Sequence, residues 1–159
     1  MAKVPLKEIK QKRDGSSGAV MVIPHVVLNS DAYKSLSASA KGLLFDIAMQ
    51  YNTINNGALL ASWRYMSEKR GWTSSDLLNK AKKELVAHCL IEQTVQGRLP
   101  NKASWYGLTW CALDTIKGLE IAVQSWPRGA YSRWKSTGDM KSKRKPPIKN
   151  HLVRTADKY

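Results

Sequence analysis

The sequence predicts an α+β fold in which three packed helices are followed by a long β-hairpin. Between residues 37 and 88, apolar side chains recur in three stretches with the 3.6-residue period of a helix. Two runs rich in β-branched and aromatic residues follow, Leu90–Val95 and Trp105–Trp110. The segment between these runs contains Gly97 and Pro100, a composition typical of a long hairpin loop.

The length and composition of the chain fit one domain with two polar ends. A chain of 159 residues with 43% hydrophobic residues can bury a core of ordinary size. Residues 1–18 are predicted to be a flexible basic arm, because they end in a Gly-Ser-Ser-Gly linker. Residues 19–135 form the predicted domain. Residues 136–159 are Lys-rich and contain Pro146-Pro147, so we expect them to be a basic disordered tail.

The net charge of +14 is concentrated at the two ends of the chain. Residues 1–14 carry five basic and two acidic side chains, residues 15–132 carry twelve and eight, and residues 133–159 carry nine and two. Half of the excess positive charge therefore lies in the C-terminal segment, which favours a polyanionic partner, most simply nucleic acid. The sequence shows no long apolar stretch, so we expect no membrane partner and a cytoplasmic, nucleoid-associated location.

The first part of the domain is predicted to be extended and then helical. Ala19–Leu28 is apolar and β-branched but contains Pro24, which lacks an N–H group. An edge strand or an extended packing segment is therefore expected there. Asn29-Ser30-Asp31 can then cap a short helix, Ala32–Leu36.

A longer helix and a turn come next. The helix is capped by Ser37 or Ser39 and is expected to run to about Tyr51, because its apolar residues keep helical spacing. Asn56-Gly57 is a strong local signal for a turn. Ala58–Ala61 can add a short third strand to the sheet of the hairpin.

Two helices separated by a tight turn occupy the middle of the chain. The first is predicted over Ser62–Arg70, with Ser62 as its N-cap and with Trp63 and Met66 on one face. Gly71 is expected to end this helix, and Trp72 is expected to pack beside it as an apolar plug.

The second of these helices is predicted over residues 74–88. It can begin directly after the turn, because three consecutive residues are good N-caps and the next suits the positive end of the helix dipole. These residues are Thr73, Ser74, Ser75 and Asp76. The expected apolar stripe consists of Leu77, Leu78, Ala81 and Leu85. The opposite face and its flanks carry Ser75, Asp76, Asn79, Lys80, Lys82 and Lys83.

The order of these elements indicates a specific architecture. Two helices joined by a short turn that contains Gly are typical of a helix-turn-helix, whose second helix can lie in the major groove of DNA. A basic hairpin after the second helix makes the arrangement a winged helix-turn-helix, with a three-helix core and a β-hairpin wing.

Five motifs resemble those of the winged helix-turn-helix proteins found in bacterial plasmids and phages. They are Asn55-Asn56-Gly57, Gly71-Trp72-Thr73-Ser74, Ala81–Leu85, Ile91–Gly97 and Tyr106–Trp110. The resemblance covers roughly residues 22–135 and implies this fold and DNA binding, without separating a transcription regulator from a replication protein. The chain departs from the family at His88-Cys89, where such proteins usually place Gly after the second helix.

The segment after Trp110 is rich in aromatic residues. Asp114 can begin a turn or a short helix, and Leu119–Val123 is a possible short strand. Trp126, Tyr131 and Trp134 indicate an extended segment that is held against the domain by its aromatic rings. Because such residues are also common interface anchors, a homodimer contact is the alternative to intramolecular packing.

The chemistry of the chain does not indicate an enzyme. His25, His88 and His151 lie in a linker, at a helix end and in the tail, and the common motifs of hydrolases, metalloenzymes and phosphate-binding loops are absent. Cys89 and Cys111 lack metal-ligand spacing and are expected to be buried thiols. We therefore expect no catalytic residue, no cofactor and no metal.

Several side chains are suited to read or hold DNA. Asn79 is the only residue on the exposed helix face that can make the bidentate contact with adenine, and lysines can contact guanine or phosphate. A solvated surface is the alternative for these residues, and dipole stabilisation is the favoured role of Asp76. Loop residues 96–103 offer contacts to the backbone or the minor groove. The predicted DNA-binding residues are Ser74, Ser75, Asn79, Lys80, Lys82, Lys83, Arg98, Lys102, Lys141, Lys143, Arg144 and Lys145.

The function expected from these residues is sequence-specific binding of double-stranded DNA. The protein would regulate transcription on a mobile genetic element, and a homodimer on paired half-sites is one expected form of binding. One alternative is a plasmid or phage replication initiation protein. Another is a winged-helix interaction module that inhibits a host nucleic-acid machine by binding a host protein.

Overall fold

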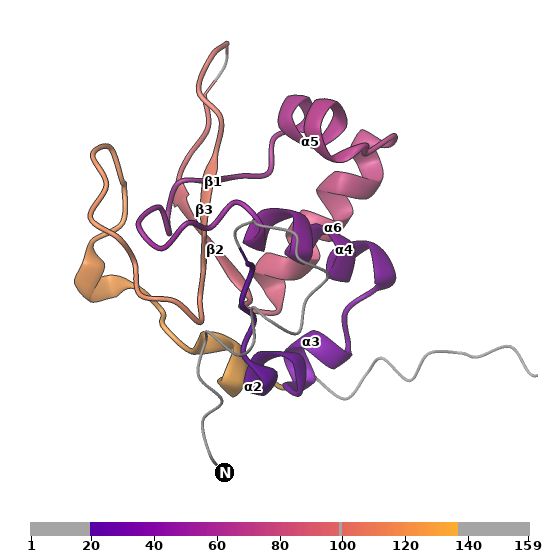
Figure 1. The fold of residues 1–159 in the computed structure, drawn as a ribbon, viewed down its shortest axis with the longest axis vertical. Helices are drawn as coiled ribbons and strands as arrows, with labels where there is room; N and C mark the ends of the chain where they lie inside the picture. Colours follow the sequence, from indigo (N-terminus) through magenta and orange to yellow (C-terminus); the bar gives the residue numbers. More distant parts are fainter. Residues whose placement is uncertain (1–19, 99, 137–159) are drawn as a thin grey trace, which may run out of the picture.

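The computed structural model describes residues 20–98 and 100–136. The predicted arm and nearly all of the predicted tail lie outside the described residues. The elements in chain order are α2 (His25–Leu28), α3 (Asp31–Lys34), α4 (Ala38–Ala48), β1 (Leu59–Leu60), α5 (Trp63–Arg70), α6 (Ser75–Ala87), β2 (Ile91–Val95), β3 (Trp105–Leu108), and the 3-10 helices η1 (Val123–Ser125) and η2 (Ala130–Arg133). Figure 1 shows the helices beside a small sheet, with the β2–β3 hairpin extending beyond it. The α+β class is confirmed, and the arrangement is compatible with the predicted winged helix-turn-helix.

The core lies mainly between α4 and α6, which pack against each other. Leu43, Leu44 and Ile47 of α4 are fully buried, as the helical spacing predicts. Ser37 is the N-cap of this helix, and its side chain accepts from the Ala40 amide. The α-helix ends at Ala48 and not near Tyr51, because the last amides bond in tighter turns, such as Tyr51 N to Ala48 O at 3.0 Å.

The predicted third strand is confirmed in a sheet of order β1-β3-β2 with antiparallel pairing throughout. A side chain covers the free edge of β1. The Leu60 amide donates to Gln50 Oε1 at 2.9 Å, and Gln50 Nε2 donates to the Leu60 carbonyl at 2.8 Å. At the other edge, the Glu120 amide donates to the carbonyl of Thr94 in β2 at 2.9 Å. Both exposed strand edges are thus partly satisfied within the chain.

A buried asparagine joins the turn before β1 to the end of β3. Asn56 is fully buried, and its Oδ1 accepts from the Leu108 amide at 2.7 Å. Its Nδ2 donates to the carbonyls of Leu108 and Ala112 at 3.1 and 2.8 Å. The Asn56 amide donates to Asp114 Oδ2 at 2.7 Å, and its carbonyl accepts from the Asp114 amide. Every hydrogen-bonding group of Asn56 therefore has a partner, because Nδ2 has two N–H donors and bonds two carbonyls.

The sequence predicts an edge strand or an extended segment over residues 19–28. The described part of this segment, residues 20–28, is not extended along its whole length. Residues 20–24 have no regular structure, but His25–Leu28 forms α2. Pro24 stands at the N-cap, where a missing N–H leaves no hydrogen bond unmade, and its carbonyl accepts from the Val27 amide at 3.0 Å. Proline here begins a helix. The following short helix does match the prediction, with Ser30 as its N-cap.

Two large apolar side chains that were predicted to face the core are exposed. Trp63 is 43% exposed, and the buried residue of α5 is Met66. Leu77 is 45% exposed, because the inward face of α6 is centred on Leu78 and Leu85. Each residue turns about 100° around a helix, so Leu77 falls outside this narrow face.

The C-terminal segment packs against the domain through its aromatic residues, as predicted, but it is not extended throughout, because it contains η1 and η2. Trp126 is buried, and its Nε1 donates to the Cys111 carbonyl at 2.9 Å. A side chain at Gly107 would clash with the Trp126 ring, since a Cβ there would lie 2.6 Å away. Trp134 stacks on His88 with ring centroids 4.3 Å apart. The strand predicted at 119–123 is absent from this described segment, which contacts β2 through one backbone bond.

The end of α6 explains the departure at His88-Cys89. The Cys89 amide donates to Val86 O at 2.9 Å and the Leu90 amide donates to Leu85 O at 3.1 Å, which is the Schellman pattern. This pattern requires a left-handed residue, and Cys89 has φ 57°. A cysteine therefore holds a left-handed conformation that glycine adopts without strain. By contrast, α5 ends at Gly71, which has φ 74°.

We predict that Cys89→Gly raises the free energy of unfolding by about 0.5–1 kcal/mol, because glycine adopts positive φ without a Cβ clash. Urea denaturation of both forms measures the difference. The control is Cys89→Ala, which keeps the Cβ atom and should give no gain. A glycine variant less stable than the alanine variant would contradict this account.

We predict that Asn56→Ala lowers the free energy of unfolding by about 3 kcal/mol, because the buried amide and carbonyl of Leu108 lose their partners. The same denaturation experiment measures the loss. Asn101→Ala is the control, since Asn101 is exposed in the hairpin loop and should change stability little. A loss for Asn56→Ala no larger than that of the control would show that water replaces the carboxamide.

Candidate nucleic-acid interface

The start of α6 is fixed by one of the three candidate caps. Ser74 is the N-cap, and its Oγ accepts from the Leu77 amide at 3.2 Å. Ser75 is the first helical residue and is exposed, and Asp76 lies in the first turn, where a carboxylate stabilises the helix dipole. Ser74 therefore has a structural task, whereas the Ser75 hydroxyl is open to solvent.

The turn before α6 is held against α4 by a carboxylate. Asp46 accepts from Arg70 Nε at 2.8 Å, and Arg70 Nη2 also lies 2.8 Å from the same oxygen. The second oxygen of Asp46 accepts from Trp72 Nε1 at 2.8 Å. Trp72 thus packs as a plug, as predicted, and its indole is also a hydrogen-bond donor. These bonds fix where the chain enters α6.

A second carboxylate fixes the rotation of α6 about its own axis. Glu84 Oε1 accepts from the Ser37 amide at 2.6 Å, and Glu84 Oε2 accepts from the Ser37 hydroxyl at 2.7 Å. Both donors lie at the start of α4, where a negative charge is favourable. On the opposite flank of α6, Lys82 Nζ donates to the Ala61 carbonyl at 3.2 Å. With both flanks tied, the remaining polar face of α6 points outward.

The outward face of α6 carries Asn79, Lys80 and Lys83. All three are exposed, and within residues 20–98 and 100–136 no hydrogen bond or ion pair engages their side chains. A helix face that offers an amide and two ammonium groups can donate to base edges and to phosphates. These three predicted residues are thus brought together and left free by the fold.

Lys82 lies in a different place from its neighbours. Its side chain is half-buried, and burial lowers the pKa of its ammonium group. It lies in a cleft of about 550 Å³ that is formed by the start of α5, α6 and the hairpin loop, residues 96–104. The lining residues include Ser62, Arg64, Lys82, Arg98, Lys102 and Ser104. The sequence placed Lys82 on the flank of the outward face, whereas its charged end is turned into this cleft.

The hairpin loop is braced by the C-terminal segment. Glu120 Oε2 accepts from the Gln96 amide at 2.8 Å, and Glu120 Oε1 accepts from Lys102 Nζ at 2.9 Å. The Gln96 amide, followed by Lys102 and more weakly Arg98, holds the pKa of the Glu120 carboxyl below its ordinary value. Across the loop, the Arg98 and Lys102 backbones exchange two hydrogen bonds of 2.8 and 2.9 Å.

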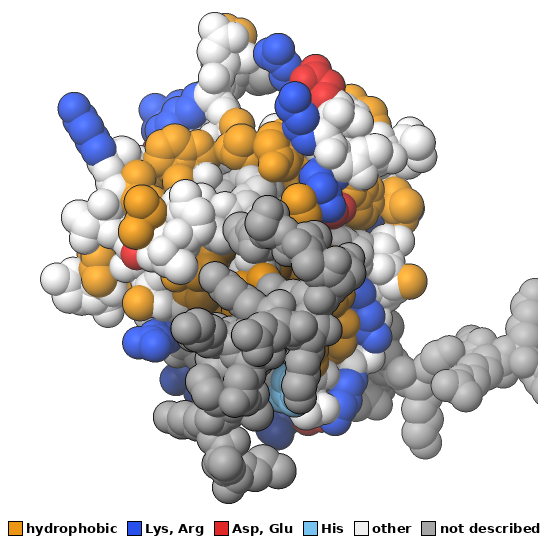
Figure 2. Space-filling model, in the orientation of Figure 1, with side chains coloured by type: hydrophobic (Ala, Val, Ile, Leu, Met, Phe, Trp, Pro, Cys, Tyr) orange, Lys and Arg blue, Asp and Glu red, His pale blue; other side chains and the backbone are white. Residues whose placement is uncertain are grey.

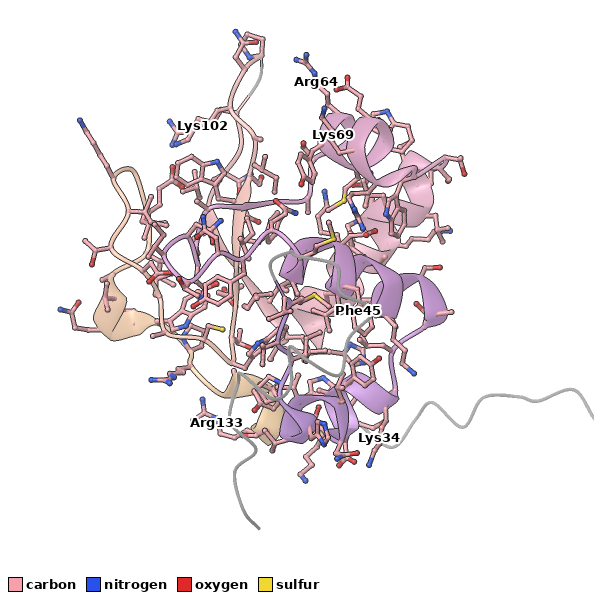
Figure 3. All side chains as sticks on the ribbon, in the orientation of Figure 1. Lys34, Phe45, Arg64, Lys69, Lys102 and Arg133 are labelled. Atoms are coloured by element: carbon pink, nitrogen blue, oxygen red, sulfur yellow. The ribbon has the colours of Figure 1, made fainter. Side chains whose placement is uncertain are left out.

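The two predicted loop cations therefore differ. Lys102 is paired with Glu120, and Figure 3 shows its side chain directed away from α5. Arg98 is exposed, and the described residues provide no hydrogen-bond or ion-pair partner for its guanidinium. Figure 2 shows Lys and Arg side chains gathered over α5 and the hairpin, at one end of the molecule. The tail residues Lys141, Lys143, Arg144 and Lys145 lie outside the described residues.

Sequence reasoning did not single out Arg64. It lies in the first turn of α5, lines the cleft, and points toward the hairpin in Figure 3. Its side chain is highly exposed and lies 3.4 Å from Glu68 one turn away. A basic residue in the first turn of a helix was the available signal, but only the folded hairpin places a second basic element opposite it.

Comparison with known proteins gives no match: no protein-family model, no curated protein and no solved structure is significantly similar to this chain. Among the helices of the described part, none is both long and apolar enough to cross a membrane.

We predict that the Gln96 amide reports the ionisation of Glu120 at low pH. The folded pKa of Glu120 lies below the ordinary glutamate value of 4.5, so the brace is complete above that value and is lost as pH falls through the lowered pKa. The NMR shift of the Gln96 amide should therefore titrate with a midpoint below 4.5.

In Glu120→Gln this titration should disappear, and the Gln96 amide should exchange faster with solvent. Glu68→Gln is the control, because among the described residues Glu68 forms an ion pair with Arg64 and not with the hairpin loop, so it should leave the Gln96 signal unchanged. A Gln96 midpoint at or above the ordinary value would contradict the brace.

Proposed function

We propose that this chain is a sequence-specific double-stranded DNA-binding protein with a winged helix-turn-helix domain. In this proposal α6 enters the major groove, and the hairpin loop is the wing that contacts the adjacent backbone or minor groove. The observation that supports it most is the outward face of α6, where Asn79, Lys80 and Lys83 project together and are unengaged by the described residues. A helix held by both flanks presents such a face in one fixed orientation.

The chemistry of this face suits base recognition. The Asn79 carboxamide can donate to N7 of adenine and accept from N6 in a bidentate contact. This contact requires one orientation of the carboxamide, which a rigid helix favours. Lys80 and Lys83 can reach guanine or flanking phosphates, and Ser75 can contact either. The charge of +14, much of it outside the described residues, supplies affinity that does not depend on sequence.

The biological setting is proposed from the resemblance of the five motifs to plasmid and phage proteins. The protein would act in the cytoplasm, associated with the nucleoid, as a transcriptional regulator of a mobile element. Occupancy of its site would be sufficient for this role, so no catalytic group or cofactor is required.

A protein-interaction role is the second candidate, and exposed apolar side chains favour it. Phe45 of α4 and Met49, the C-cap residue of this helix, are one turn apart, and Met49 is 58% exposed. Met21 and Val22 line a small hollow with Ala48 of the same helix, and Val22 is 73% exposed. Apolar surface of this kind can mark a protein contact.

We predict that the full-length chain enriches a specific site from a random duplex pool at about 150 mM salt. On that site, Asn79→Ala should weaken binding by about 1–3 kcal/mol and should have little effect on unrelated duplexes. Lys143→Ala is the control, because a phosphate contact from the tail should weaken all sequences equally and reduce the salt slope by about one. Titrations of each protein on both duplexes measure these effects.

Two results would separate the candidate functions. If Asn79→Ala weakened all sequences equally, α6 would not be the reading helix. If no site were enriched, while all duplexes bound with a steep salt dependence, the domain would be assigned to a protein partner.

A further inference from the structure

We propose that the cleft between α5, α6 and the hairpin loop holds one backbone phosphate of the bound duplex, with Lys82 at its floor and Arg64 and Arg98 at its rims. This inference rests on the proposed function and makes it more specific. The hairpin loop would then lie against the sugar–phosphate backbone, and its tip would not enter the minor groove.

The floor of the cleft carries a positive charge without a negative partner. Lys82 is half-buried, and its ammonium group uses one of three N–H donors in the bond to Ala61 O. No carboxylate of the described residues lies within ion-pair distance of it. Desolvation without a counter-ion lowers its pKa, so an anion in the cleft would relieve an existing penalty.

The rims of the cleft are cations that can turn to an anion at little cost. Arg64 is 87% exposed in its side chain, and its one ion pair with a described residue is the helix-surface pair with Glu68. Such exposed pairs contribute little to stability, so a phosphate can replace Glu68 readily. On the other rim, the Arg98 backbone is fixed by its two bonds to Lys102, while its guanidinium is exposed.

Three other polar side chains of the cleft already have partners within the protein. Ser62 Oγ accepts from the Tyr65 amide, and Ser104 Oγ accepts from the Gly97 amide at 2.9 Å. Lys102 is bound to Glu120. The groups left to bind a ligand are then the cationic donors of Lys82, Arg64 and Arg98 and the exposed carboxamide of Asn101, and this excess of positive donors favours an anion.

The cleft lies where the backbone of a DNA strand that is read by α6 would pass. Asn79 and Lys82 are three residues apart on α6, so they are neighbours on the helix surface. A DNA strand with a base that contacts Asn79 therefore has its sugar–phosphate backbone close to the mouth of the cleft. A volume of about 550 Å³ falls in the range of small-ligand sites, so it admits a phosphate with its sugars but not a duplex.

The test uses the full-length chain and a set of duplexes that carry the enriched site with one neutral methylphosphonate at each position in turn. For the unmodified protein, one position facing the cleft should weaken binding about tenfold when its charge is removed. Lys82→Met should weaken binding to the unmodified duplex about tenfold and should no longer respond to the methylphosphonate at that position.

Lys69→Met is the matched control, because Lys69 is exposed in the last turn of α5 and does not line the cleft. It should keep the full response to the methylphosphonate. The measurement on the unmodified protein needs no substitution, so it holds even if a variant folds poorly. Exchange of G·C for I·C pairs beside the site removes the minor-groove amino group and should leave affinity unchanged.

The outcomes separate this inference from the proposed function. If the chain selects a site but Lys82→Met keeps the response to every methylphosphonate, the phosphate seat is wrong and the proposed function stands. If I·C exchange changes the affinity, the loop enters the minor groove and the inference fails. If no duplex is bound but inorganic phosphate shifts the NMR signal of Lys82, the cleft takes a free anion, and both proposals are overturned.

Discussion

The hydrogen bonds of Asn56 are the constraint on which the arrangement of sheet, helices and C-terminal segment depends. One buried carboxamide bonds both the amide and a carbonyl of the β3 terminus, in the manner of a neighbouring strand, and the Asn56 backbone bonds Asp114. The turn before β1 is thereby joined to the point where the chain leaves the sheet. Because a buried polar group without a partner is costly, these bonds admit one register and not a range.

From that fixed point, carboxylates set the direction of the elements that carry charge. Asp46 ties the turn before α6 to α4, and Glu84 ties one flank of α6 to the start of α4. Glu120 ties the C-terminal segment to the hairpin loop. Each carboxylate accepts hydrogen bonds from groups of a different element, so each fixes the position of one element relative to another. The outward face of α6 and the cleft follow from these positions.

Local signals in the sequence predicted the helices and strands well, but the sequence did not predict the long-range contacts. The caps Ser37, Ser62 and Ser74 were readable because a cap acts within its own turn. Pro24 was misread, since the same residue interrupts a strand and begins a helix. The contact of Glu120 with Lys102 joins residues that are distant in the sequence, and no periodic pattern indicates it. For this reason Asn79 and Lys83 were placed correctly on the outward face, whereas the partner of Lys102 and the role of Arg64 were not foreseen.

The distinction between local and long-range contacts also explains how a domain of modest net charge can present a basic surface. Residues 15–132 carry only four more basic than acidic side chains, which taken alone is weak support for DNA binding. Yet Asp46, Glu84, Asp114 and Glu120 each accept hydrogen bonds from other elements of the fold. Acids that are engaged in this way are held beside donors of the protein, while Lys80, Lys83 and Arg98 face solvent. The described charged side chains of α6 and the hairpin loop that have no partner within the fold are therefore mainly basic, with Asp76 as the exposed acid among them.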